Sequence, residues 1–210
     1  MQNTDGRKRS ATAPDRGTAV PDRLLSAATR LFAEQGFERT SVQELVSAAG
    51  VTKGAMYHYF ASKDDLLYAI YQRVLAMQME RLNGFAGAEG PVRERLRQAA
   101  IDVVHTTVDN LDDTRIFFRS LHMLSADRQI AVRKERRQYH ERFRAMVEEG
   151  QRQGVFRADV PADIAVTQYF GAVHHLSTWY RTGGALTGGE VGAYFADLFL
   201  AGLSPVESAD

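Results

Sequence analysis

Residues 41–60, SVQELVSAAGVTKGAMYHYF, contain two short helical patterns joined by the tight turn AAGVT. Gly50 lets the chain turn sharply because glycine tolerates a positive φ angle. The apolar residues around the turn can share one small core: Val42, Leu45, Val46, Val51, Met56 and Phe60. Two helices fixed in this way, the second exposed on its far side, are the structural requirement of a helix-turn-helix that enters the DNA major groove.

The second helix of this unit, expected over 52–59, has an outward face suited to DNA. At about 100° per residue, Gly54 and His58 point away from the apolar side. Ala55 and Tyr57 flank them. Small residues allow close approach to the groove, and the aromatic residues can bond to phosphates or base edges. An exposed aromatic rim that binds another protein is the alternative interpretation of the Tyr-His-Tyr run.

Positive charges and hydroxyl groups frame this helix. Lys53 and Lys63 bracket it with charge for the DNA backbone. Thr40 and Thr52 stand at the starts of helices, where a hydroxyl and free N–H groups can hold a phosphate. Tyr59 is the weakest of the aromatic candidates, because its angle turns it back toward the core.

Helical patterns follow one another from residue 22, and no convincing period-2 strand appears. Capping-box patterns occur at Thr40 with Gln43 and at Thr187 with Glu190. The glycine-rich break after Leu82 is expected to end the long fourth helix. The sequence predicts an all-α protein of about nine helices, over 22–35, 41–49, 52–59, 63–82, 91–111, 114–124, 127–153, 161–181 and 188–202.

The domain division follows from these patterns. We expect a disordered basic tail over 1–19, whose arginines and lysine form either a solvated tail or an arm that touches DNA phosphates. A helix-turn-helix domain is expected over 20–68 and a ligand-binding and dimerisation domain over 69–204. Residues 205–210 are expected to be a second disordered tail.

Composition excludes several classes of protein. The chain has 210 residues and 44% apolar residues, as a folded globular protein does. It contains no cysteine, which excludes a disulfide scaffold, a thiol redox sensor and a cysteine–zinc site. No run of about 18 apolar residues and no signal-peptide pattern occurs, so a cytoplasmic location is expected. The net charge is zero and gives no support for DNA binding by itself.

A longer stretch, AATRLFAEQGFERTSVQELVSAAGVTKGAMYHYFASKDDLL, resembles the N-terminal domain of TetR-family repressors. The family pattern is met at fixed spacing by Phe32, Gly36, Phe37, Thr40, Ser41, Leu45, Ala49, Gly50, Val51, Thr52, Gly54, Met56, Tyr57, Tyr59, Phe60, Ser62, Lys63 and Leu66. The resemblance implies an all-helical, dimeric repressor that binds a palindromic operator in double-stranded DNA. With the outward face described above, it gives as DNA-contact positions Thr40, Ser41, Thr52, Lys53, Gly54, Ala55, Tyr57, His58, Tyr59 and Lys63.

The last two expected helices, 161–181 and 188–202, are apolar on more than one face. A helix that is apolar nearly all round must be buried on both sides. One side can pack on its own domain and the other on the same helices of a second subunit, which gives a two-fold homodimer. The residues expected at this interface are Leu176, Tyr180, Val191, Tyr194, Phe195, Leu198 and Phe199.

A small-molecule site is expected between the helices of 91–181. Bulky apolar and aromatic walls with a few polar groups are typical of such sites, although ordinary core packing is the alternative for each residue. The candidates are Phe117, Phe118, Leu121, His122, Tyr139, Phe143, Met146, Phe170, His174 and Trp179. A ligand there would favour one position of the fourth helix and so change the spacing of the two DNA-reading helices.

The class of ligand rests on a second resemblance. The segment WYRTGGALTGGEV, residues 179–191, resembles a segment of TetR-family repressors of fatty-acid and steroid catabolism, whose effectors are acyl-CoA thioesters. On physical grounds alone these residues end one helix and cap the next. The basic run 133–144 is either a solvated helix face or a site for coenzyme A phosphates. A drug-like or other hydrophobic ligand, with control of an efflux transporter, is the alternative.

Other functions find little support in the sequence. There is no G-x-S-x-G motif, no phosphate-binding glycine loop and no paired carboxylates on one helix face, so no enzymatic activity is expected. The six histidines make no convincing metal-ligand set, and no cofactor is implied. A helical protein-interaction module without DNA affinity is the remaining alternative.

Overall fold

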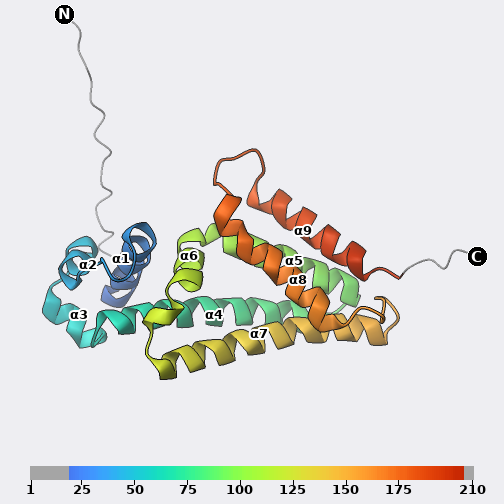
Figure 1. The fold of residues 1–210 in the computed structure, drawn as a ribbon, viewed down its shortest axis with the longest axis horizontal. Helices are drawn as coiled ribbons and strands as arrows, with labels where there is room; N and C mark the ends of the chain where they lie inside the picture. The colour runs from blue at the N-terminus through green and yellow to red at the C-terminus, as the bar shows by residue number, and fades with distance from the viewer. Residues whose placement is uncertain (1–18, 206–210) are drawn as a thin grey trace, which may run out of the picture.

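The computed structural model describes residues 19–205, which form nine α-helices and a single 3-10 turn over Leu121–Met123. The expected all-α fold is confirmed, and most of both expected tails lies outside the described residues. Figure 1 shows α1–α3 at one end of α4, with α5, α8 and α9 toward its other end and α7 alongside it. The helices are α1 (Val20–Gln35), α2 (Val42–Ala49), α3 (Lys53–Tyr59), α4 (Lys63–Gly87), α5 (Val92–Asp109), α6 (Leu111–Arg119), α7 (Ala126–Arg152), α8 (Ala162–Trp179) and α9 (Gly188–Leu203).

The start of α2 lies one residue later than the sequence pattern predicted. Ser41, not Thr40, is the N-cap: its Oγ accepts from the Glu44 N–H at 3.2 Å, and the Glu44 carboxylate accepts from the Ser41 N–H at 2.8 Å. The predicted box of Thr40 with Gln43 was therefore wrong, because the Thr40 side chain turns inward. The capping box of Thr187 with Glu190 at the start of α9 is confirmed.

Most other boundaries differ from the prediction by up to three residues, and the ends of α4 and α6 differ by more. Helix α4 continues through the glycine-containing stretch to Gly87, because Phe85 and Ala86 still pack against the core and keep the helix in place. Helix α6 ends at Arg119, where the chain tightens into the 3-10 turn instead of continuing to residue 124. A local sequence pattern cannot predict where these two helices end, because packing against other helices determines it.

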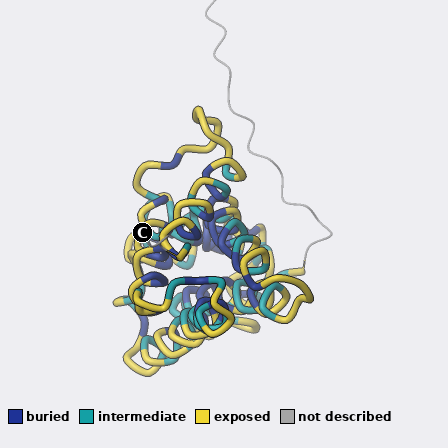
Figure 2. The backbone as a smooth tube through the Cα atoms, turned by 90° about the vertical axis from the view of Figure 1, so that its right-hand side faces the viewer, coloured by how far each residue is buried: buried dark blue, intermediate teal, exposed yellow. Residues whose placement is uncertain are grey.

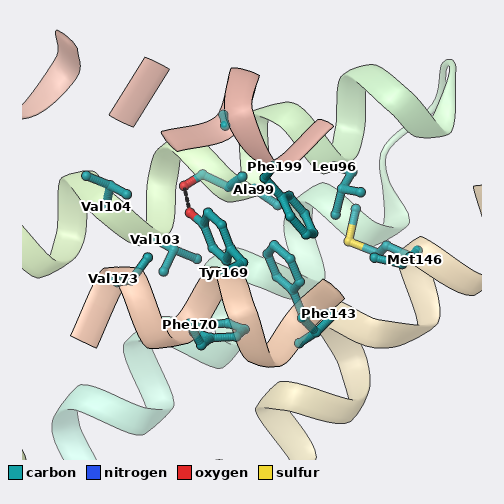
Figure 3. Packing of buried hydrophobic residues seen from close by; sticks show 14 of the residues in the cluster. Leu96, Ala99, Val103, Val104, Phe143, Met146, Tyr169, Phe170, Val173 and Phe199 are labelled. Carbon is teal, nitrogen blue, oxygen red and sulfur yellow. Dashed lines mark hydrogen bonds between the residues drawn. The ribbon is translucent and has the colours of Figure 1, made fainter. Parts of the chain in front are cut away.

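The buried residues form two cores, and Figure 2 shows buried positions concentrated on the inner sides of the helices. The first core joins α1–α3 to the first half of α4 and takes in Ile116 of α6 and Val132 of α7, so it continues beyond residue 68. The second core lies among α5, α7, α8 and α9. Figure 3 shows the rings of Phe143, Tyr169 and Phe199 gathered there.

Helices α4 and α6 connect the two ends of the molecule. The Tyr71 hydroxyl of α4 lies near the carbonyls of Ile116 and Phe117, 3.1 and 2.9 Å away, and donates its proton between them. Arg73 donates to the Asp113 carboxylate of α6 at 2.7 Å and to the Thr29 hydroxyl of α1 at 3.2 Å. These hydrogen bonds link α4 to α6 and to α1, and α1 in turn packs against α2 and α3.

Candidate DNA interface and ligand cavity

Helix α3 is fixed at its start by a cap and along its inner side by one buried residue. The Thr52 hydroxyl accepts from the Ala55 N–H at 3.1 Å and so satisfies one of the free donors of the first turn. The Met56 side chain is fully buried in the first core, while Ala55 and Phe60 are half-buried. The opposite side of the helix is left open to solvent, as the sequence predicted for a helix that enters a groove.

The exposed side of α3 carries one lysine, one glycine and three aromatic side chains. Tyr57 and Tyr59 are 52% and 50% exposed, and His58 packs edge-on to the Tyr59 ring with 4.8 Å between ring centroids. The expectation that Tyr59 turns back toward the core was wrong, because the inner side of the helix is occupied by Met56, with Phe60 packed beside the same core. Lys53 is also exposed, as are the predicted contact residues Ser41 and Thr52.

Gly54 is not required by the fold. A Cβ added there would approach nothing closer than the Thr52 Oγ1, at 3.8 Å, which is an ordinary contact. Its φ angle is not positive, so the backbone also accepts other residues. Glycine within a helix costs about 0.5–1 kcal/mol relative to alanine. Because Gly54 lies on the exposed side of α3 and has no side chain, it leaves the helix backbone open to solvent at this position.

Two of the predicted contact residues are engaged within the fold. Thr40 is only 1% exposed, and its hydroxyl donates to the Gly36 carbonyl at 2.8 Å. The Lys63 ammonium donates to the carbonyls of Phe37 and Thr40 at 2.7 and 2.9 Å and lies over the Phe37 ring. Burial lowers the pKa of Lys63. Both side chains hold the turn between α1 and α2, a partnership that only the tertiary structure reveals.

A small cavity of about 40 Å³ lies between α4, α5, α6, α7 and α8 and is partly open to solvent. Half of the candidate ligand residues line it: Phe117, Phe118, Tyr139, Phe170 and His174. The lining polar residues that the sequence analysis missed are Gln78, Thr107, Thr114, Arg136 and His140. Most of these residues are far apart in the sequence, which does not indicate that they line the same cavity. Only Arg136 and His140 are close together, one helical turn apart.

The other candidates lie elsewhere. Phe143 and Met146 are buried in the second core, and Leu121 and His122 belong to the 3-10 turn. Trp179 is exposed at the end of α8, where its ring stacks on Phe195. Phe143 and Met146 therefore follow the core-packing alternative, and Leu121, His122 and Trp179 lie outside the cavity lining.

The two histidines of the cavity are held among aromatic rings. His140 stacks on Phe170 with 4.2 Å between ring centroids, and His174 lies 4.5 Å from the Phe118 ring. Burial, with a smaller effect of the Arg136 charge, lowers the pKa of His140 and lowers that of His174 to about 4. Both imidazoles are therefore neutral at pH 7 and act as hydrogen-bonding groups rather than charges.

The expected dimer residues separate into two sets. Leu176, Tyr180, Val191 and Phe199 are buried within the chain itself and so face its own core. On the outer side, Tyr194 is 57% and Leu198 74% exposed, and Phe195 is half-buried beside them. The exposed large apolar residues of α8 are Ile164 and Trp179.

The segment 179–191 forms the end of α8, a loop and the capped start of α9. Gly183 has a φ angle of 79° in this loop, which favours glycine. Within the basic run, Arg137 pairs with Glu141, Arg144 pairs with Asp163 and Arg142 donates to Asn83. These three side chains form a solvated helix face, whereas Arg136 points to the cavity.

Sequence comparison defines the class to which this fold and this interface belong. Residues 24–70 match the model of bacterial regulatory proteins of the tetR family, and residues 89–203 match a tetracyclin repressor-like C-terminal domain. The chain belongs to the TetR family of transcriptional regulators, which are DNA-binding proteins and not enzymes. No helix among residues 19–205 is long and apolar enough to span a membrane.

Particular relatives agree in fold over most of their length. The HTH-type transcriptional repressor KstR2 of Rhodococcus jostii is 27% identical over 192 residues, which are 86% of this chain and 89% of the relative. The crystal structure of the TetR-family regulator PfmR from Thermus thermophilus has a TM-score of 0.80 at 30% identity, covering 88% of this chain and 100% of that one. KstR2 of Mycobacterium tuberculosis, described as a ketosteroid transcriptional regulator, superposes with a TM-score of 0.81 at 23% identity, over 91% and 98% of the two chains.

Proposed function

We propose that this protein is a transcriptional repressor that binds a palindromic operator as a homodimer and is released by a small, mainly apolar effector. The observation that carries the proposal is the open face of α3, where Lys53, Gly54 and the aromatic run stand clear of the core. The similarity to KstR2, which is named a repressor, supports the sign of regulation.

The proposed DNA contacts come mainly from this face. Lys53 and Gly54 approach the base edges, and Tyr57, His58 and Tyr59 approach phosphates and base edges. Ser41 and Thr52, at the starts of α2 and α3, place exposed hydroxyls beside free backbone N–H groups. Thr40 and Lys63 act indirectly in this proposal, because they fix the turn that orients α2.

The proposed dimer uses the outer sides of α8 and α9. Leu198, Tyr194 and Ile164 are among the most exposed large apolar residues, and they lie on these two helices. Packing α8 and α9 against the same helices of a second subunit would cover them around a two-fold axis. A two-fold axis would also present two α3 helices to successive half-sites of a palindrome.

The proposed effector site is the cavity, because its walls include the two helices that connect to the DNA-reading end. Val74, Leu75 and Gln78 belong to α4, and Phe117 and Phe118 to α6. A ligand that binds better when α4 and α6 are displaced shifts the population toward a state that does not fit the operator. Acyl-CoA thioesters are the first effector class to test, and drug-like apolar molecules are the second.

The test is DNA binding followed by fluorescence anisotropy, with the DNA upstream of the coding sequence as the probe. Lys53→Ala and Tyr57→Ala are expected to weaken binding on the order of tenfold. Lys134→Ala removes a lysine exposed on α7 and is expected to leave binding unchanged. If both α3 variants bind as the wild type does, the contact assignment is wrong; if no duplex is bound at all, the protein-interaction alternative is favoured.

A further inference from the structure

One arginine of the cavity differs from the other arginines of α7. The Arg136 guanidinium lies 5.0 Å from the Phe117 ring centroid and 5.6 Å from that of Phe118. Several arginines of this helix have carboxylate partners: Arg128 pairs with Asp64 and Asp65, and Arg137 pairs with Glu141. Arg133 donates instead to the side-chain oxygen of Gln129. Among the ion pairs and hydrogen bonds of residues 19–205, none involves Arg136.

The surroundings of Arg136 contain no negative charge. No aspartate or glutamate is among the described residues that line the cavity. Burial is the main influence on the pKa of Arg136 and lowers it. Of the two smaller influences, Tyr71 raises this pKa and the charge of Arg133 lowers it. The neighbouring imidazoles of His140 and His174 are neutral at pH 7, so the guanidinium is the single charge inside the cavity.

A partly desolvated cation without a counter-charge is costly, and aromatic faces compensate it only in part. The planar fork of donors on an arginine matches the paired oxygens of a carboxylate or phosphate. The His140 and His174 rings, 6.1 Å apart, can each add one N–H donor beside it. Val74, Leu75, Val103 and Val173 face the same space, and the remaining polar lining residues, among them Gln78, Thr107 and Thr114, carry no charge.

We propose that Arg136 is the headgroup site of the cavity and that the effector is an apolar molecule carrying an anionic oxygen group. The apolar part lies among the valine, leucine and phenylalanine side chains, and the anion pairs with the guanidinium and with one or both imidazole N–H groups. The regulatory consequence rests on the proposed function above, but the binding step does not require DNA. Two sources of the anion are open to test: a carboxylate on the ligand itself, or a phosphate of coenzyme A.

The experiment is isothermal titration of the full-length protein with matched ligand pairs. Hexanoate, octanoate and decanoate are compared with hexanol, octanol and decanol, which share the tails but lack the charge. Decanoyl-coenzyme A supplies the phosphate source. The variants are Arg136→Met, which keeps an unbranched side chain without charge, Arg136→Lys, which keeps the charge without the fork, and the control Arg137→Met, which removes an exposed arginine one residue away.

For the wild type and Arg137→Met, we expect the carboxylates to bind on the order of tenfold or more tightly than the alcohols. Arg136→Met is expected to abolish that difference, and Arg136→Lys to retain part of it. If the thioester rather than the carboxylates loses affinity in Arg136→Met, the anion is a phosphate. The proposal would be overturned if Arg136→Met bound both the carboxylates and the thioester as tightly as the wild type does, or if the wild type bound neither the carboxylates nor the thioester.

DNA binding separates this result from the proposed function. The Arg136→Met protein, with unchanged helical circular dichroism, is expected to bind operator DNA as the wild type does and to lose release by the anionic ligand only. If the wild type binds no DNA, the repressor proposal fails while the ligand titration still decides the role of Arg136.

Discussion

The replacement Gly54→Ala separates the demands of the fold from those of DNA binding. The added methyl group would lie 3.8 Å from the Thr52 Oγ1, so it introduces no strain in the free protein. Alanine in a helix is favoured over glycine by about 0.5–1 kcal/mol. For a domain of this size, 1 kcal/mol corresponds to about 2–4 °C, so we expect a melting temperature about 1–4 °C higher.

The same methyl group would stand between α3 and the base edges. Overpacking a close-fitting contact costs about 1–3 kcal/mol, which corresponds to about five- to 150-fold in the dissociation constant. We therefore expect a more stable protein with weaker DNA binding, measured by thermal unfolding and by anisotropy. Gly84→Ala is the matched control: it adds a methyl group in open space on α4 and is expected to stabilise without affecting DNA binding.

Two results would refute this reasoning. Unchanged DNA affinity of Gly54→Ala would show that the glycine is not needed for close approach. A lower melting temperature of the variant would show that the fold itself requires glycine at this position.

Three further predictions concern other parts of the molecule. Lys63→Ala is expected to lower the free energy of unfolding by about 1–3 kcal/mol in urea titrations, because the carbonyls of Phe37 and Thr40 lose a charged donor. An unchanged free energy of unfolding would mean that the ammonium group contributes to DNA binding only. Leu198→Asp is expected to convert the dimer to monomer in analytical ultracentrifugation, because a charge enters the proposed apolar interface, and a persisting dimer would place the interface elsewhere. Burial lowers the pKa of His174 from 6.5 to about 4, so the unfolded chain binds the proton more readily. The free energy of unfolding that the neutral His174 contributes is present above pH 6.5 and decreases as the pH falls, by about 2 kcal/mol between pH 6.5 and 5. His174→Leu is expected to reduce this pH dependence of the unfolding free energy, measured in urea titrations at the two pH values.

The helix-turn-helix could be predicted from the sequence because its information is local. The cap at Thr52, the turn at Gly50 and the inward Met56 all lie within a few residues of one another. The error at the start of α2 is instructive, because Thr40 and Ser41 are both good N-cap residues. The choice between them depends on the Gly36 carbonyl and on Lys63, which the tertiary fold brings to Thr40.

The cavity and the outer faces of α8 and α9 were harder to predict. An apolar helix with two possible faces does not indicate which face its own chain will cover, so Leu176 and Leu198 looked alike in sequence. In the structure Leu176 lies in the second core and Leu198 faces solvent. The aromatic candidates divided in the same way, with Phe170 at the cavity and Phe143 buried beside it.

The order of helices, the outward face of α3 and the family were determined by the sequence alone, because periodicity, caps and turn residues act over one or two helical turns. Tertiary structure alone decided that Lys63 closes the turn after α1, that α4 continues to Gly87 and that Arg136 stands uncompensated beside two histidines. These features depend on which side chains and carbonyls meet across distant parts of the chain, and the packing of the helices against one another determines those meetings.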